Sequence, residues 1–230
     1  MPPYTWKSLR YEPGHSADAV RVMLSDADIA AQIASGDVTL VAGRGNLAEN
    51  SEHAMAGIDA FLSAVSNAKV LPVLRRGNVR GALSLGLSPR SGMDAARILE
   101  ASANGKVDCL ILLGADPMSD VPDTDLARRG IAGARCVISI DTTLSTSTQH
   151  ADVVLPASAF AEKDGTTTNL EGRVTDVVQQ ITSRGTSRPD WMIAVELAYM
   201  LGHDFGVLSL EELQRLMKKE MMIYVRQSEE

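Results

Sequence analysis

The run "VDCLILLGADP" (107–117) and the run "RCVISID" (135–141) decide the fold of this chain. Each is a short block of apolar and β-branched residues, which is typical of a strand covered on both faces of a sheet. Between them, "DTDLARRGIAG" (123–133) reads as a helix after a turn. A strand, a helix and a second strand in this order predict two parallel strands joined by a crossover helix.

The same alternation continues on both sides of this segment. Further apolar runs predict strands at 38–43, 68–74 and 152–156, and capped periodic segments predict helices at 26–35, 49–65, 93–105, 188–204 and 209–222. We therefore predict an α/β fold, a doubly wound and mostly parallel Rossmann-like sheet of about five strands with helices on both faces. Pro72 places its strand near an edge, because proline has no N–H for a central ladder.

The remaining segments are predicted from their turn residues. The glycine-rich segment 75–92 lacks both helical and strand periodicity, so we predict a long loop. "KDGTTT" (163–168) is predicted as a polar loop, and the segment after Arg173 as a strand near the sheet edge. Ser25 is the expected N-cap of the first helix. We expect two parts, an N-terminal extension over 1–24 and one α/β domain over 25–230.

Composition limits the classes of partner. The net charge of −7 and the pI of about 5.2 give no general attraction to nucleic acid. No apolar run approaches the roughly 20 residues of a membrane span, and the N-terminus lacks the apolar core of a signal peptide. We expect a cytoplasmic protein without direct membrane insertion. Cys109 and Cys136 lie in strand-like runs, which favours buried thiols over a disulfide and leaves too few cysteines for an iron–sulfur cluster.

The ends of the predicted strands carry the candidate binding sites. "GRGNLA" (43–48) fits the dinucleotide fingerprint through Gly43, Gly45 and Ala48, but structural packing, an anion site and NAD binding all remain open. "GADP" (114–117) is a strand-to-helix turn that brings backbone amides to the sheet edge. "DTT" (141–143) caps a short helix or offers a carboxylate and two hydroxyls to a nucleobase or ribose.

A polar stretch follows the last short strand, from Glu162 to Arg173. Its carboxylates and amide either act in catalysis or cap an exposed excursion in which Gly165 permits the turn. No nucleophile or poised base stands near it, and the chain has neither a G-x-S-x-G elbow nor a P-loop. The histidines lack metal-ligand spacing, so we predict no catalytic residue and no metal site.

The order of these motifs resembles a known family. G-x-D-P at 114–117, A-D-V-V-L-P at 151–156, E-K-x-G-T-x-x-N-x-E-G-R at 162–173 and R-P-D-W at 188–191 resemble the third domain of molybdopterin oxidoreductases. Among these, "LPVLRRGNVRGALSLGL" (71–87) looks most like the large iron–sulfur subunit of NADH-quinone oxidoreductase, respiratory complex I. That resemblance implies a structural part of the peripheral arm in NADH-to-quinone electron transfer.

The resemblance also implies what the chain lacks and where it acts. It lacks the cysteine-rich cluster segments of a complete large iron–sulfur subunit and the cysteine or selenocysteine that ligates molybdenum. A partial or reduced form of that subunit without redox centres or a cofactor of its own is therefore expected, not catalytic alone. Its partners would be other peripheral-arm subunits, and its location the inner face of the cell membrane through the complex. The alternative is a fragment of a molybdopterin oxidoreductase that binds molybdopterin guanine dinucleotide.

For both the complex I subunit and the molybdopterin oxidoreductase fragment, the resemblance implies a pterin-dinucleotide pocket at the strand ends. In the complex I subunit this pocket is expected to be vestigial. The matching residues are Gly114, Ala115, Asp116, Pro117, Asp141, Thr142, Glu162, Gly165, Asn169, Glu171 and Arg173. We expect residues 114–117, 141–142 and 169–173 to converge on one edge of the sheet. Because Asp116 and Asp141 add negative charge there, we expect GDP to bind with a dissociation constant above roughly 1 mM.

Overall fold

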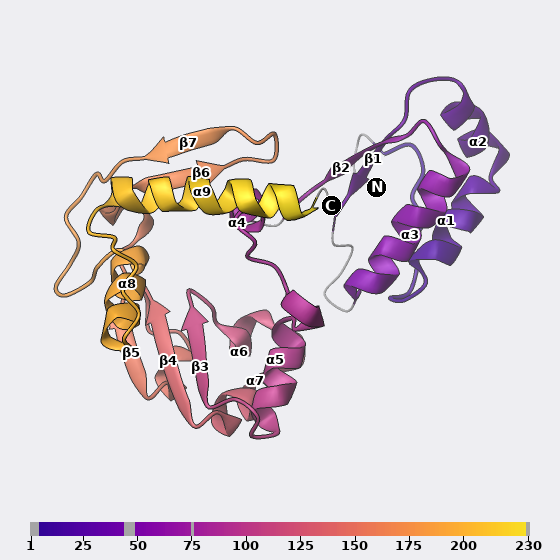
Figure 1. Ribbon diagram of the computed structural model, residues 1–230. Helices are drawn as coiled ribbons and strands as arrows, with labels where there is room; N and C mark the ends of the chain where they lie inside the picture. Colours follow the sequence, from indigo (N-terminus) through magenta and orange to yellow (C-terminus); the bar gives the residue numbers. More distant parts are fainter. Residues whose placement is uncertain (1–4, 44–48, 75, 229–230) are drawn as a thin grey trace. The chain divides into compact units, whose positions relative to one another are not determined.

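The computed structural model describes residues 5–43, 49–74 and 76–228, and their contacts form two compact units, residues 1–75 and 76–230 (Figure 1). Within the described ranges, no helix combines the length and hydropathy that a membrane span requires. The domain boundary after residue 24 stays a prediction.

The first unit holds two short parallel strands and three helices. β1 (Thr39–Ala42) pairs with β2 (Lys69–Pro72), and β2 has no second neighbour in this sheet, which agrees with the edge position predicted from its proline. The helices are α1 (Ser16–Leu24), α2 (Ala27–Ala34) and α3 (Ser51–Ala64). α1 was not predicted and lies inside the expected extension.

The cap of α2 differs from the prediction. Asp26, not Ser25, is the N-cap, because its carboxylate accepts hydrogen bonds from the backbone N–H groups of Asp28 and Ile29. The Ser25 hydroxyl instead donates to the carbonyl of Val22 at the end of α1. Ser25 therefore bonds the last turn of α1, and Asp26 caps the first turn of α2.

The second unit is built on a three-stranded parallel sheet in the order β3-β4-β5. Its strands are β3 (Cys109–Leu113), β4 (Cys136–Asp141) and β5 (Val153–Pro156). The predicted crossover is present: α7 (Thr124–Gly133) connects β3 to β4 after the short helix α6 (Pro117–Asp120). The five predicted strands are all found and pair in parallel, but as sheets of two and three strands rather than one sheet of five.

The core of this sheet lies under one face. Leu110, Leu112 and Val137 pack with Ile131 of α7, and Leu99 of α5 (Ala95–Ala103) is also buried. The two helices approach closely, because a Cβ on Gly133 would lie 2.2 Å from the carbonyl oxygen of Ser102. Partly buried apolar neighbours complete this core: Ile98, Val107, Met118, Ala134 and Ala151.

The opposite face is only partly covered. Ile193 of α8 (Asp190–Met200) packs on Ile140 and Ala157, at the β4 and β5 side of the sheet. The side chains of β3 on this face stay exposed, with Ile111 at 50% and Leu113 at 58%. Alternate residues of one strand therefore meet different surroundings.

Two predicted loops are ordered elements. The polar loop 163–168 contains β6 (Gly165–Thr168), which pairs antiparallel with β7 (Val174–Val177), because its β-branched threonines suit a two-stranded ladder. The segment 75–92 contains α4 (Val79–Ser84), where Gly81 serves close packing: a Cβ there would lie 2.4 Å from Asn78 Oδ1.

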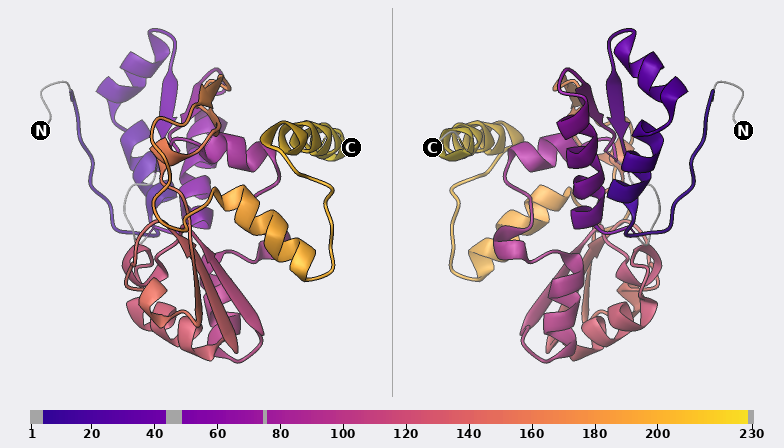
Figure 2. Two further views of the ribbon diagram at one scale, coloured as in Figure 1. Left: turned by 90° about the vertical axis from the view of Figure 1, so that its left-hand side faces the viewer. Right: turned by 90° about the vertical axis from the view of Figure 1, so that its right-hand side faces the viewer.

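The hairpin and the last helix complete the second unit. α9 (Leu210–Ser228) and the β6–β7 hairpin lie on the side toward which the arrows of β3, β4 and β5 point, in the view of Figure 1 and the turned views of Figure 2. Arg80 Nη1 of α4 donates to the carbonyl of Leu170 in the hairpin turn, and the Thr168 N–H donates to Asn78 Oδ1 at 2.8 Å. α4 therefore fixes the position of the turn.

Candidate functional site

Two of the three predicted segments meet at the carboxyl end of the sheet. The Gly114 N–H donates to the carbonyl of Ile140 at 2.8 Å, and Asp141 is in register with Pro156. Residues 114–117 and 141–143 therefore follow neighbouring parallel strands at one edge, which we call the strand-end edge. This convergence is the geometry expected where an α/β sheet binds a ligand.

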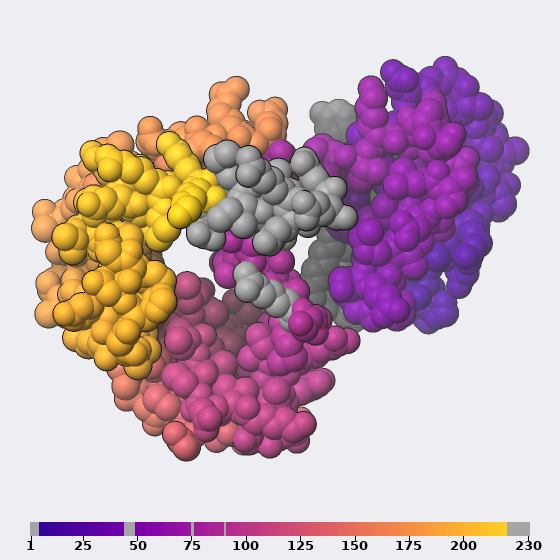
Figure 3. Space-filling view, viewed as in Figure 1, coloured from indigo at the N-terminus to yellow at the C-terminus, as the bar shows by residue number. Residues whose placement is uncertain are grey.

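Gly114 begins the strand-end edge in a conformation that needs glycine. Its φ is 55°, a region that side chains with a Cβ rarely adopt, and no atom lies within 4 Å of the position of an added Cβ. The backbone turn at the end of β3 is therefore open to approach. Figure 3 shows an opening in the second unit between the yellow surface of α9 and the magenta and rose surface below it.

Asp116 connects the two halves of the strand-end edge. Its carboxylate accepts hydrogen bonds from the N–H of Ser147 at 3.0 Å, from the Ser147 hydroxyl, and from the Ser119 hydroxyl at 2.7 Å. The Ser147 hydroxyl in turn accepts from the Met118 N–H. Asp116 therefore holds the turn after β3 against the loop after β4.

These contacts also set the acidity of the Asp116 carboxyl group. Partial burial raises its pKa, but the hydrogen bonds from Ser119 and Ser147, together with the backbone N–H groups of Ser147 and Thr146, outweigh it. The net effect lowers the pKa of Asp116 below its ordinary value. The ionised carboxylate is thus satisfied internally, and its charge is directed at protein donors rather than outward.

Asp141 does not cap a helix, because the next helical turn begins at Thr148; its carboxylate bonds the backbone that follows it and remains half exposed. One oxygen accepts from the N–H of Thr142 at 2.6 Å and from that of Thr143 at 3.3 Å, a turn in which aspartate bonds its own following backbone. A carboxylate has about four acceptor sites, so these bonds leave acceptor capacity on Asp141. The two threonines beside it are exposed. This turn leaves the Asp141 carboxylate able to bind a ligand as well.

The polar stretch around the hairpin is held by local bonds. Glu162 is buried and its carboxylate accepts from the Ala159 N–H at 2.9 Å, so it caps a short turn. Asn169 Oδ1 accepts from the Arg173 N–H, and Asn169 Nδ2 donates to Glu171. Gly165 starts β6, with open space beside it. The β6–β7 hairpin lies on the sheet's carboxyl side (Figure 1), and the side-chain bonds of Asn169 stay within its turn.

The sequence patterns did not reveal a group of buried hydroxyls beneath the strand-end edge. Ser139 is fully buried and its Oγ lies 3.0 Å from Thr148 Oγ1, which also lies 2.8 Å from Ser145 Oγ. Ser147 is fully buried as well. The run "STST" (145–148), next to the aspartate of the preceding turn, is the signal that could have found it.

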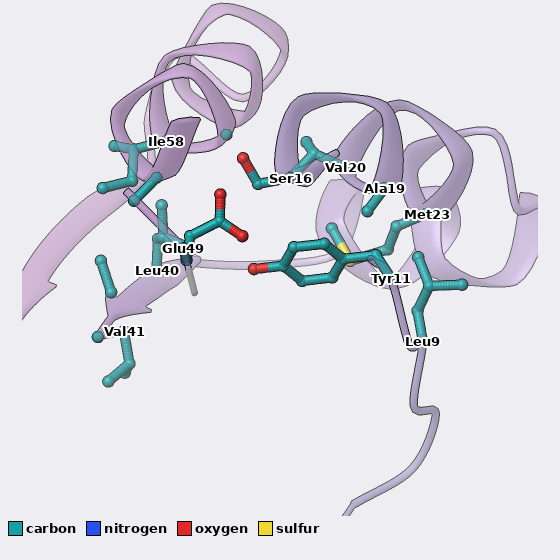
Figure 4. Close-up of a pocket in the computed structure, with 14 residues that line it drawn as sticks. Leu9, Tyr11, Ser16, Ala19, Val20, Met23, Leu40, Val41, Glu49 and Ile58 are labelled. Atoms are coloured by element: carbon teal, nitrogen blue, oxygen red, sulfur yellow. The ribbon is translucent and has the colours of Figure 1, made fainter. Parts of the chain in front are cut away.

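A separate cavity of about 250 Å³ lies in the first unit, between α1, α3 and β1 (Figure 4). The buried carboxylate of Glu49 and the hydroxyl of Tyr11 face its interior, and the Gly14 N–H donates to both Glu49 oxygens at 3.2 and 3.3 Å. Gly43 lines the cavity, while Gly45 and Ala48 of the fingerprint lie outside the described residues. A carboxylate in an apolar wall disfavours the phosphate interpretation of this motif.

Redox and metal ligands are limited in the described part of the chain. No cluster of three or more His, Cys, Asp or Glu side chains suits a metal ion there. Cys109 and Cys136 are free thiols; Cys109 is exposed, so the prediction of a buried thiol is wrong there, and Cys136 is only partly buried. The alternation of β3 explains this, because Cys109 shares the uncovered face with Ile111 and Leu113.

Comparison with known proteins agrees with these motifs. The catalytic subunit of an assimilatory nitrate reductase from Bacillus subtilis is 33% identical over 127 residues, covering 54% of this chain and 18% of that protein. The alpha subunit of an NADPH-Fe(3+) oxidoreductase from Geobacter sulfurreducens is 30% identical over 151 residues, covering 56% and 18%. The chain thus matches less than a fifth of the length of these curated relatives.

A solved structure and a family model extend the comparison. The acetylene hydratase of Pelobacter acetylenicus is similar over 46% of this chain and 15% of its own, with 22% identity and a TM-score of 0.43. The family model described as molybdopterin oxidoreductase matches residues 27–200, well over half of the chain. The chain therefore belongs to the molybdopterin oxidoreductase family.

Proposed function

We propose that this chain is a segment of a molybdopterin oxidoreductase and that its strand-end edge binds the guanine dinucleotide end of the cofactor. The observation that carries the proposal is the convergence of 114–117 and 141–143 at the carboxyl edge of a parallel sheet, in a chain of this family. Dinucleotides bind α/β sheets at such edges.

The residues present fit the nucleotide end of that cofactor. Gly114 leaves open space where a side chain would stand, so a bound group can approach the backbone. Asp141 keeps acceptor capacity for a ribose hydroxyl or for the N–H donors of guanine. The hydroxyls of Thr142 and Thr143 stand beside it and are exposed.

Charge decides which part of the cofactor this edge would hold. Asp116 stays ionised, but its carboxylate accepts hydrogen bonds from Ser147 and Ser119, which weakens the repulsion that we expected it to exert on a diphosphate. Asp141 remains half exposed, and a carboxylate favours a base or sugar over a phosphate. When bound in a complete enzyme, the cofactor supplies the redox chemistry through its metal. The residues of this chain would bind and orient its guanosine.

This role takes precedence over the complex I assignment. The similar proteins are a nitrate reductase subunit and an NADPH-Fe(3+) oxidoreductase subunit, which support the dinucleotide-binding alternative rather than the complex I subunit specifically. The peripheral-arm partners and the membrane-associated location depend on the complex I assignment and stay predictions. Electron transfer from NADH to quinone likewise belongs to that assignment.

Calorimetric titration of the chain with GDP tests the proposal. The proposed role, unlike the complex I assignment with its empty pocket, predicts saturable binding of GDP with a dissociation constant below roughly 1 mM. Asp141→Ala should weaken binding at least about tenfold, the equivalent of about 1.4 kcal/mol, because it removes the acceptor for guanosine. Asp125→Ala is the matched control, since it removes an exposed carboxylate of α7 that pairs with Arg128 and Arg129.

Two results would contradict the proposal. The first is no heat of binding at GDP concentrations of several times 1 mM, with the chain shown to be folded by circular dichroism. The second is equal weakening by both aspartate substitutions, which would indicate a general charge effect. ADP serves as the competing ligand, because adenine lacks the pair of N–H donors that guanine offers to a carboxylate.

A further inference from the structure

Cys109 and Cys136 stand directly opposite one another. They are Cα partners at the first position of the β3–β4 register, so their side chains leave the sheet on the same face. Adjacent strands lie about 4.7 to 4.9 Å apart, and disulfide-bonded residues have Cα atoms about 4.4 to 6.8 Å apart. The strand pairing therefore places the two backbones within the range that a disulfide spans.

The two thiols are reachable from solvent. Cys109 is exposed and Cys136 is partly buried, on the face of β3 that α8 does not cover. Ile111, next along β3 on the same face, is 50% exposed. An oxidant of modest size can thus reach the pair without unfolding the sheet.

The sulfurs also interact. Partial burial raises the pKa of the Cys109 thiol, and the neighbouring Cys136 raises it further through its charge and a side-chain hydrogen bond. A raised pKa keeps Cys109 mostly protonated at neutral pH, which slows its attack on electrophiles. The reduced pair is therefore persistent, and its oxidation should accelerate as the pH rises.

We propose that Cys109 and Cys136 form a dithiol modification site that closes to a disulfide when the chain meets a disulfide oxidant such as oxidised glutathione. The thiolate of one cysteine attacks the oxidant and releases one reduced glutathione as the leaving group. The second thiolate then attacks the mixed disulfide, which forms the internal S–S bond and releases the second glutathione. The two protons go to the released thiolates, and the electron pair reduces the oxidant.

The closed state would tie together the two strands that lead to the strand-end edge. β3 ends next to Gly114 and β4 ends at Asp141, so the crosslink fixes the register of both from their first residues. The reversible bond should raise the midpoint of thermal unfolding, because it constrains the unfolded chain. It needs no contribution from the proposed nucleotide site and is independent of it.

Equilibration of the full chain in glutathione redox buffers tests the site. Free thiols are trapped by alkylation, and the intact mass distinguishes loss of two hydrogen atoms from addition of glutathione. We expect the internal disulfide in monomeric protein, reversed by dithiothreitol, with a peptide map that joins Cys109 to Cys136. Denaturing the chain in urea should lower the effective concentration of the two thiols by about tenfold or more, since the sheet no longer aligns them.

A matched variant moves one thiol along the same face. The double substitution Cys109→Ser and Ile111→Cys keeps two cysteines, but position 111 is in register with Ile138, so the new pair is diagonal. Diagonal neighbours lie about 7 to 8 Å apart, beyond disulfide range. We expect mixed glutathione disulfides without an internal bond. An equal internal yield in this variant, an intermolecular dimer, or glutathione adducts on both native cysteines would overturn the proposal.

Discussion

The two faces of the β3-β4-β5 sheet differ although the same strands build both. On one face Leu110, Leu112 and Val137 are at most 7% exposed beneath α5 and α7. On the other face Ile111 and Leu113 are at least 50% exposed, because α8 covers only the β4 and β5 side. Burial here follows from which helix covers the strand, not from hydrophobicity, since all these side chains are aliphatic.

The covered face of the sheet stabilises the fold, whereas the open face can accept different side chains. The covered face carries the tight packing on which the unit depends, down to glycines that let α7 touch the backbone of α5. The open face tolerates thiols beside aliphatic side chains without enclosing them. Substitutions at matched positions on the two faces should therefore have unequal effects on the free energy of unfolding.

The largest effect is expected at Leu112, which is buried in the core of the covered face. Leu112→Ala should lower the free energy of unfolding by about 3 to 4 kcal/mol, because it removes buried methylene and methyl groups and leaves a cavity. Leu113→Ala, one residue along on the open face, should change it by less than about 0.5 to 1 kcal/mol. Urea unfolding of both variants measures the difference. Similar losses at both positions would show that the open face is covered in solution.

The helix packing over the covered face gives the next largest effect. A Cβ at Gly133 would lie 2.2 Å from the Ser102 carbonyl oxygen and 2.8 Å from the Ala103 Cα, so Gly133→Ala forces α5 and α7 apart. We expect a loss of about 2 to 3 kcal/mol. Gly165→Ala is the control, because no atom lies within 4 Å of its added Cβ. A thermal midpoint unchanged by Gly133→Ala would contradict this close approach.

The next prediction concerns Asp116, which lies in the turn after β3 and bonds the loop after β4. Asp116→Ala removes the acceptor for Ser147, which is fully buried, and for Ser119. Hydrogen bonds to charged groups each contribute about 1.5 to 3 kcal/mol, and relaxation of the exposed part reduces the net loss, so we expect about 2 kcal/mol. Unfolding at neutral pH measures it. Ser119→Ala, which removes only the more exposed donor, should cost less.

The pH dependence of the Asp116 contribution gives the smallest effect. Because its pKa is lowered in the folded state, the unfolded chain binds more protons in the acid range, and the stabilisation is present above the ordinary pKa of 3.8. It should be lost as the pH falls below this value and through the lowered folded pKa. The gap in unfolding free energy between the wild type and Asp116→Ala should thus narrow between pH 6 and about pH 3. A difference in unfolding free energy that does not change with pH would show that the ionised Asp116 carboxylate does not stabilise the fold.

The local sequence pattern was sufficient to predict most helices and strands, because hydrophobic periodicity and the residues that start or stop an element are properties of the chain itself. The strands within 107–117 and 135–141 were recognisable as apolar runs, and the helices predicted at 93–105 and 123–133 begin in the structure at the Asp94 and Asp123 caps. The errors occurred where tertiary packing used a residue in an unusual way. Gly81 reads as a loop signal, but it lets α4 pack against β6.

The candidate site was also predicted only in part from the sequence. The chain order alone placed Gly114, Asp116 and Asp141 after parallel strands, since such strands end on one side of a sheet. Only the structure assigned their roles: Asp116 turns inward to Ser147, 31 residues away, while Asp141 caps its own turn and stays half exposed. The spacing of these residues in sequence carries no information on that choice.

By itself, the sequence determined the five parallel strands, most of the longer helices and the family, because periodicity, caps and motif order are local or linear features. The tertiary structure decided which face of each strand is covered, which carboxylate is satisfied and that Cys109 faces Cys136. The physical reason is that burial and register depend on contacts between segments far apart in the chain. A shift of one residue in the β3–β4 register would exchange the two faces.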